Sequence, residues 1–311
     1  MILTVTANVA VDRTYVIDHL EVGAVHKVTR AHAQTGGKGV NVSRCLRSLG
    51  AQTLITGVIG RSALADATSD LAQSGIESKL FAIDGAPRQT VTVTAKDGST
   101  TAFDEPGPTV TERDWDAFEA HTAELLDGIS TLVIAGSLPP GAPDRALAGL
   151  CRQANRHGVQ VILDARGAAL RMALKERPLI VKLNRAELAQ TLDRQVTTDS
   201  DVLSGAAELR ALGAGSVVVT LGEHGAIGVN GDCWRVTHPP AAGNPIGAGD
   251  AFSAALARGL GSGRSFPELL REGAAAALAS ISTPTAGALD AADYEVALGA
   301  VQVDAMQEVE R

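Results

Sequence analysis

Short apolar segments alternate with longer amphipathic ones along almost the whole chain, and this alternation limits the folds open to it. Runs such as "TLVIAG" and "VQVILDA" are apolar nearly throughout, as expected of parallel strands that crossover helices cover on both faces. The pattern therefore indicates an α/β fold with a mostly parallel sheet. We predict strands at 2–8, 53–59, 131–135, 159–164, 179–183 and 216–221. We predict helices at 39–49, 62–74, 112–126, 144–157, 185–192, 200–212, 248–260, 266–281 and 291–302.

Two segments, about 12–32 and 88–104, break this rhythm. In the second, "TVTVTA" alternates polar and apolar residues and "KDGS" is a hairpin turn. We expect both segments to form a small antiparallel sheet that projects from the main body, and an edge hairpin of the main sheet is the alternative. Because the chain has no linker, repeat or low-complexity block, we expect one domain over 1–311.

Charge and composition exclude several classes of protein. Acidic residues outnumber basic ones by 35 to 27, a net charge of -8, which argues against binding to nucleic acid or to an anionic membrane. The apolar start of the chain is cut short by Asp12 and lacks the basic residues of a signal peptide, and no run is long enough to span a membrane.

The three cysteines are far apart and form no C-x-x-C pair, so we expect a reducing, cytoplasmic compartment. The seven histidines show no metal-ligand spacing.

The stretch "NPIGAGDAF" places Gly247, Ala248 and Gly249 at a predicted helix start, directly before Asp250. Its "GAGDAF" ends in Phe252 and so does not match the G-x-G-x-x-G dinucleotide pattern, and the stretch around "TGGKGVN" does not match a Walker A loop. Free backbone amides at a helix start, aided by the helix dipole, can bind a phosphoryl group, and small side chains let it approach. The alternative is that Asp250 only caps the helix.

Three further motifs are candidates for a site. In "TGGKGVN", Gly36 and Gly37 permit close approach of a ligand and Lys38 brings a charge, unless this is a plain flexible loop. In "VKLNRAE", an Asn and a Glu three residues apart can place oxygens toward Mg²⁺, usually through its waters, but the same pattern is a helix capping box. In "TLGEHGA", a strand ends in a glycine turn that either bounds a nucleotide or only reverses the chain.

These motifs, in this order and together with "GSLPPG", resemble those of the PfkB family of ribokinase-like carbohydrate kinases, in its phosphofructokinase-type branch. The resemblance covers residue 8 to about 287. It implies a three-layer α/β/α core of mostly parallel strands with a β-sheet lid, ATP and Mg²⁺ as cosubstrate and metal, and a homodimer formed through the lid.

The resemblance also implies roles for individual residues. Asp250 corresponds to the general base, and Gly247, Ala248 and Gly249 to the anion hole for the transferred phosphoryl group. The residues that match the substrate side are Asp12, Lys27, Gly36, Gly37, Lys38, Asn41, Arg88 and Ser137. Those that match the nucleotide side are Lys182, Asn184, Thr220, Gly222 and Gly225, with Asn184 and Glu187 at the metal.

The implied substrate is a ketohexose phosphate. Lys27, Lys38 and Arg88 lie in acid-poor motifs of an acidic chain, so we expect them to form a local positive site for the sugar's phosphate. Since "GKGVNV" resembles members of the branch that act on fructose 1-phosphate, we expect phosphorylation of its 6-hydroxyl to give fructose 1,6-bisphosphate. Tagatose 6-phosphate and fructose 6-phosphate remain alternatives, as do a kinase for unphosphorylated sugars or nucleosides and a sugar-phosphate-binding regulator without catalysis.

Overall fold

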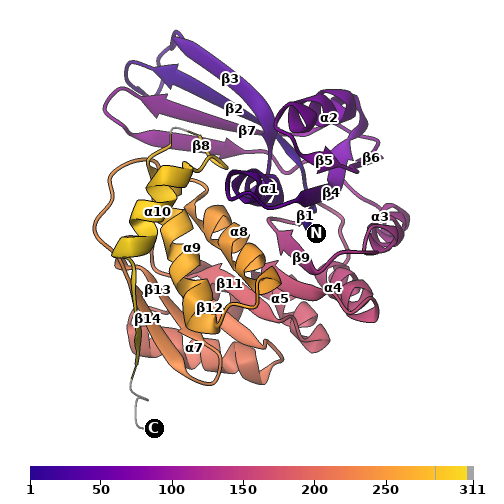
Figure 1. Ribbon diagram of the computed structural model, residues 1–311. Coiled ribbons are helices and arrows are strands. Elements are labelled where there is room, and N and C mark those ends of the chain that lie inside the picture. The colour runs from indigo at the N-terminus through magenta and orange to yellow at the C-terminus, as the bar shows by residue number, and fades with distance from the viewer. Residues whose placement is uncertain (284, 307–311) are drawn as a thin grey trace.

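The computed structural model describes residues 1–283 and 285–306. A large sheet lies between two layers of helices, and a smaller sheet projects from one end of it (Figure 1). This confirms the predicted α/β/α class and the separate small sheet. The predicted domain also includes Pro284 and 307–311, which lie outside the described residues.

The large sheet is parallel over most of its width. Its order is β15-β14-β13-β12-β11-β10-β9-β1-β4-β5, with β6 paired to β4. The parallel strands are β1 (Ile2–Thr6), β4 (Thr53–Gly60), β5 (Glu77–Ser78), β6 (Phe81–Ile83), β9 (Thr131–Ala135), β10 (Gln160–Asp164), β11 (Ile180–Asn184) and β12 (Ser216–Thr220). All six predicted strands are among them, and their ends shift by at most two residues.

The sequence interpretation missed an antiparallel extension at one edge. It consists of β13 (Ala226–Val229), β14 (Cys233–Thr237) and β15 (Gln302–Ala305). These strands are short, and β15 mixes Val303 with Gln302 and Asp304, so the pattern that marks a buried strand is weak. Residue 302, predicted as helix, belongs to β15.

Alternate residues of the core strands pack on opposite helical layers. In β10, Leu163 faces one layer while Ile162 faces the other. The layer on the Ile162 side contains α1 (Lys38–Ser48), α8 (Ala248–Gly261), α9 (Phe266–Ile281) and α10 (Ala291–Ala300). The layer on the Leu163 side contains α3 (Glu112–Glu124), α4 (Ala146–Arg156), α5 (Gly167–Ala173), α6 (Arg185–Leu192) and α7 (Asp199–Ala211). Helix α2 (Leu64–Gln73) packs beside α1, and only α5 had not been predicted.

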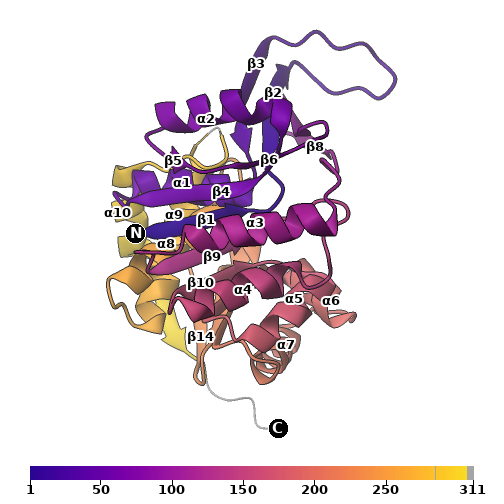
Figure 2. The same ribbon diagram turned by 90° about the vertical axis from the view of Figure 1, so that its right-hand side faces the viewer.

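The small sheet, which we call the lid, has the strand order β3-β2-β7-β8. Its strands are β2 (Ala10–Ile17), β3 (Arg30–Gly36), β7 (Arg88–Ala95) and β8 (Thr100–Asp104). The expectation of a purely antiparallel sheet is wrong, because the central pair β2 and β7 is parallel. Residues 18–29, predicted within a strand segment, form instead a long connection that extends away from the core (Figure 2).

No helix in residues 1–283 or 285–306 combines the length and the apolar character that a membrane crossing requires.

Candidate active site

A cavity of about 1000 Å³ lies where the lid meets the carboxyl ends of the core strands. Ligands of open α/β sheets bind at this edge of the sheet. Of the residues predicted for the substrate, the cavity is lined by Asp12, Gly37, Lys38, Asn41, Arg88 and Ser137. Of those predicted for the nucleotide and metal, it is lined by Lys182, Asn184, Glu187, Thr220, Gly222 and Gly225, and Gly247, Ala248, Gly249 and Asp250 line it as well.

Two predicted residues do not line this cavity. Lys27 lies exposed in the 18–29 connection of the lid. Gly36 ends β3 beneath the Asp12 side chain, and a Cβ at Gly36 would lie 2.0 Å from Asp12 Cγ. Gly36 therefore makes room for the carboxylate of Asp12 rather than for a ligand.

The start of α8 provides two amides for an anion. Gly247 is the N-cap residue with a φ of 89°, in the left-handed region that favours glycine. Among the described residues, the amides of Gly247 and Gly249 have no hydrogen-bond acceptor, while that of Ala248 donates to the Pro245 carbonyl at 3.2 Å. The expectation of three free amides is therefore wrong for Ala248, and Gly247 and Gly249 remain as donors aligned with the positive end of the helix dipole.

Asp250 follows these amides in the first turn of α8 and is buried. One carboxylate oxygen accepts a hydrogen bond from Asn41 Nδ2 at 2.8 Å. Burial, reinforced by the charge of Asp164, raises the pKa of Asp250 to about 6, although Lys38 and Lys182 oppose the shift. A helix start favours the ionised form of a carboxyl group, but loss of hydration outweighs that effect here. The raised pKa suits a group that must accept a proton near neutral pH.

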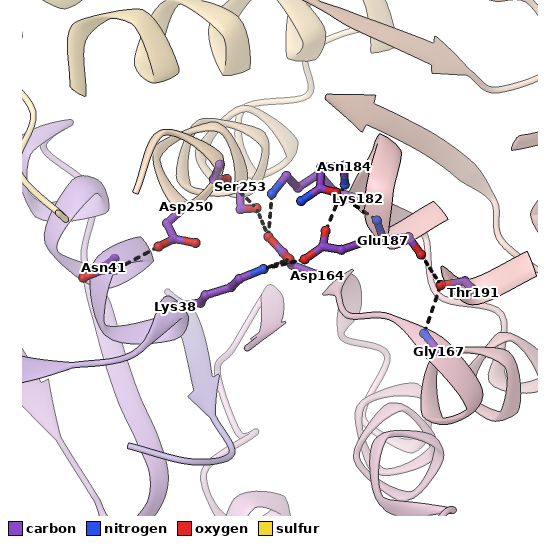
Figure 3. Close-up of polar contacts among 11 residues, drawn as sticks. Lys38, Asn41, Asp164, Gly167, Lys182, Asn184, Glu187, Thr191, Asp250 and Ser253 are labelled. Carbon is purple, nitrogen blue, oxygen red and sulfur yellow. Dashed lines mark hydrogen bonds and ion pairs between the residues drawn. The ribbon is translucent and has the colours of Figure 1, made fainter. Parts of the chain in front are cut away.

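A network of ion pairs adjoins Asp250 (Figure 3). Asp164, at the carboxyl end of β10, accepts from Lys38 Nζ at 3.1 Å through Oδ1 and from Lys182 Nζ at 2.7 Å through Oδ2. Lys38 Nζ also lies 3.1 Å from Glu187 Oε1. Burial alone would raise the pKa of Asp164, but the two lysines outweigh it and lower that pKa to about 2. The ion pairs of this network join two carboxylates, those of Asp164 and Glu187, to two ammonium groups, and the carboxyl group of Asp250 lies beside them.

The sequence interpretation missed Asp164. The signal was an acidic residue at the end of the otherwise apolar run "VQVILDA". A charged group there needs a partner, because leaving it buried and unpaired is costly.

The three predicted cations do not form one positive site. Lys38 points toward Asp164 and Glu187 (Figure 3), Arg88 pairs with Asp104 at 3.5 Å, and Lys27 lies in the lid connection. The expectation treated each motif separately, whereas the fold brings acidic residues from distant elements to Lys38 and Arg88. Arg88 is thus the predicted cation that faces the cavity from the lid.

The lid end of the cavity contains Asp12, Arg88, Thr90 and Asp104. Arg88 Nε donates to the Glu105 carbonyl at 3.0 Å, which holds the guanidinium near the rim. Burial raises the pKa of Asp12 above its usual value, although Arg88 opposes the shift. A carboxylate can accept hydrogen bonds from the hydroxyls of a sugar phosphate, and a guanidinium beside it can bind the phosphate.

Asn184 and Glu187 form the capping box that was the alternative interpretation of their spacing. Asn184 Oδ1 accepts from the Glu187 amide, and Glu187 Oε2 accepts from the Asn184 amide, each at 2.9 Å. Since Mg²⁺ in nucleotide sites keeps several waters and uses one or two carboxylates, Glu187 fits a contact through water. The described residues contain no group of three acidic, histidine or cysteine side chains arranged to hold a metal directly.

The glycines of "TLGEHGA" serve the turn after β12. Gly225 has a φ of 81°, and a Cβ there would lie 2.0 Å from the Val236 carbonyl oxygen. A glycine is therefore required at position 225, because the backbone packs directly against β14. Thr220 and Gly222 border the cavity, and a Cβ at Gly222 would meet no atom within 4 Å.

The fold and this site together define a carbohydrate kinase with a ribokinase-like fold. Comparison with known proteins supports this class. The pfkB family of carbohydrate kinases matches residues 5–292. The chain is 34% identical over 260 residues to the 1-phosphofructokinase of Vibrio cholerae, covering 83% of this chain and 82% of that protein.

Two solved structures resemble this fold over nearly the full length of the chain. A possible 1-phosphofructokinase of Thermotoga maritima has a TM-score of 0.90 and 26% identity, over 99% of this chain and 100% of that one. Phosphofructokinase-2 of Escherichia coli in complex with fructose-6-phosphate has a TM-score of 0.87 and 29% identity, over 96% and 98%. The chain belongs to the pfkB family of carbohydrate kinases, and within it to the sugar-phosphate kinases.

Proposed function

We propose that this protein transfers the γ-phosphoryl group of ATP to the 6-hydroxyl of fructose 1-phosphate, giving fructose 1,6-bisphosphate. One observation carries the proposal: Asp250 is buried beside the unpaired amides of Gly247 and Gly249, with a pKa raised to about 6. A proton acceptor and an anion site thus adjoin in one cavity, as transfer to a hydroxyl requires.

In this mechanism Asp250 accepts the proton of the attacking hydroxyl, and Asn41 orients its carboxylate through the 2.8 Å hydrogen bond. The amides of Gly247 and Gly249 hold the transferred phosphoryl group, and Lys182 lies next to them. A Cβ at Gly249 would be only 2.8 Å from Lys182 Nζ. Phosphoryl transfer depends mainly on such alignment and charge compensation.

Glu187 and Asn184 would hold Mg²⁺ near the nucleotide through its waters, where the ion neutralises phosphate charge. The ion would balance charge here, because the carboxyl group of Asp250 lies beside ion pairs that already join the two ammonium groups to Asp164 and Glu187.

The acceptor phosphate is assigned to the lid end, where Arg88 faces the cavity. The Vibrio cholerae relative acts on fructose 1-phosphate by its name, whereas phosphofructokinase-2 of Escherichia coli binds fructose-6-phosphate. We choose fructose 1-phosphate because the sequence relative covers 83% of the chain at the higher identity of 34%.

A coupled assay of ADP release tests the substrate. Fructose 1-phosphate, fructose 6-phosphate, tagatose 6-phosphate and fructose are compared with Mg²⁺-ATP, and ³¹P NMR identifies the product. We expect the highest kcat/KM with fructose 1-phosphate and fructose 1,6-bisphosphate as the product. Preference for another ketose phosphate would change the substrate but keep the reaction, while a lack of ADP release with every sugar, despite binding, would favour a regulator without catalysis.

We also propose that the lid forms a homodimer. The 18–29 connection exposes Val22 by 100% and Val25 by 98%, and apolar side chains this exposed commonly mark a protein interface. Phosphofructokinase-2 of Escherichia coli is tetrameric in its inhibited form. Light scattering of the wild type should give a dimer, and Val22→Asp/Val25→Asp should give a monomer. A wild-type monomer at assay concentration would refute this contact.

We also propose that the reaction takes place in the cytoplasm, because the three cysteines of the described chain form no disulfide.

A further inference from the structure

We propose that Asp164 is a positioning residue for the transfer reaction, which sets both Lys38 and Lys182 at the phosphoryl group and holds them there before any ligand binds. The inference rests on the proposed function and adds to it a group that no motif of the sequence marks. Asp164 touches neither the hydroxyl nor the phosphoryl group in this account, and it acts only through its two lysines.

The placement of Asp164 follows from the register of the sheet. Asp164 and Lys182 are direct neighbours on the parallel strands β10 and β11. Both side chains point to the α8 side of the sheet, the same side as Ile162 and Ile180. Neighbouring strand ends therefore bring a carboxylate and an ammonium group together beneath the start of α8, at 2.7 Å.

The second oxygen of Asp164 brings in another part of the chain. Lys38 extends from the start of α1 to Oδ1 at 3.1 Å, so one carboxylate joins α1 to β11. The Ser253 hydroxyl of α8 lies 3.2 Å from Oδ2, which connects the helix that carries Asp250. Asp164 is 0% exposed and thus has no contact with solvent. A carboxylate in such a position, with both oxygens occupied, is fixed more firmly than either lysine stem would be alone.

The lysines need this anchor because their stems are flexible. Lys182 Nζ lies beside Gly249, at the amides that receive the phosphoryl group. Without Asp164, Lys38 keeps only Glu187, and Lys182 loses its 2.7 Å partner. A displacement of about 1 Å in a group that aligns a reaction can cost about 100-fold in rate.

Asp164 also acts on Asp250 through its charge, which supplies a measurable signature. The charge of Asp164 raises the pKa of Asp250, after the larger contribution of burial, and Lys38 and Lys182 lower it. Neutralising Asp164 should therefore move the titration of Asp250 to lower pH. The titratable or charged groups that face Asp250 from the elements packed against it are Lys38 and Cys45 of α1, Asp164 of β10 and Lys182 of β11.

The test uses Asp164→Asn in the full-length protein, with Asp116→Asn as a matched control at an exposed ion pair with Arg145. We expect Asp164→Asn to lower kcat about 100-fold while the KM for the sugar phosphate changes less than about three-fold. In the free protein, without nucleotide or metal, the ¹³C carboxyl resonance of Asp250 should titrate below the wild-type value. The control should match the wild type in both measurements.

A double variant keeps the inference testable if Asp164→Asn folds poorly. Asp164→Asn/Lys182→Met removes one charge of each sign, so it leaves less unpaired buried charge than Asp164→Asn alone. If Asp164 acts through its lysines, the double variant should lose less activity than the product of the two single losses, because one of the two lysines that Asp164 holds is already absent.

Three results would overturn the inference. The first is a titration of Asp250 that does not change in Asp164→Asn, and the second is a double variant whose loss in kcat equals the product of the two single losses. The third is an Asp164→Asn variant whose one defect is a higher Mg²⁺ requirement, which would show that Asp164 acts on the metal ion. Absence of kinase activity in the wild type would instead refute the proposed function, and the titration in the free protein would still report on Asp164.

Discussion

The two ends of the cavity hold their charged groups in different ways. At the core end, Asp164 and Asp250 are buried and bonded to partners on α1 and β11 at 2.7 to 3.1 Å. At the lid end, Arg88 Nε donates to the Glu105 carbonyl at 3.0 Å, but the ion pair of Arg88 with Asp104 is longer, at 3.5 Å, and the Asp104 side chain is 65% exposed. The ion pairs at the core end are thus short and buried, while the ion pair at the lid end is long and partly open to solvent, so we expect the lid end to adjust more when a ligand binds. Preorganised groups contribute most to rate and adaptable ones to binding, so substitutions at the two ends should separate kcat from KM.

The largest effect is expected at the core end. Asp250→Asn should lower kcat by roughly 10³-fold or more, because the amide keeps the shape of the side chain but cannot accept the hydroxyl proton. Steady-state ADP release measures this change, and binding of ATP and sugar phosphate by calorimetry should stay close to the wild type. Near-normal turnover would show that another group takes the proton.

A smaller effect, on KM, is expected at the lid end. Arg88→Ala should raise the KM for the sugar phosphate roughly 10- to 100-fold, since a charged hydrogen-bonding group is lost from the phosphate. Its effect on kcat should be much smaller. Arg145→Ala, which removes an exposed arginine paired with Asp116, serves as the control. An equal loss in kcat from Arg88→Ala would break the proposed division between the two ends. Arg88→Ala also separates a sugar-phosphate kinase from one for unphosphorylated sugars, because only the former should lose affinity for its acceptor. Lys38 suits this test less well, since it is already paired with Asp164 and Glu187.

A third effect is on stability rather than on rate, and its sign depends on pH. The folded-state pKa of Asp250 is about 6, above its ordinary value of 3.8, so its contribution to stability is full below about 3.8 and is lost as pH rises through about 6. Asp250→Asn removes this ionisation and should stabilise the fold at alkaline pH by up to about 3 kcal/mol. Urea unfolding across pH should show the gain vanish in acid. A destabilised variant at alkaline pH would contradict the raised pKa.

Much of the fold could be predicted from the sequence, because apolar strand runs and amphipathic helices repeat regularly. The lining of the cavity was predictable wherever a local motif marks it, as at Gly247 to Asp250. Asp164 could not be found this way, since its partners Lys38 and Lys182 come from other elements and only the strand register brings them together. The raised pKa of Asp250 could not be predicted for a similar reason. The helix start is visible in the sequence, but the burial and the neighbouring Asp164 are not.

The central claim is that the base is prepared by the protein before substrates bind. Titration of side-chain carboxyls by ¹³C NMR in the free wild-type protein tests it most directly, with Asp250→Asn used to assign the resonance. We expect one carboxyl to titrate at about pH 6 and to be missing from the variant. A resonance of Asp250 that titrates near its ordinary value of 3.8 would contradict the account.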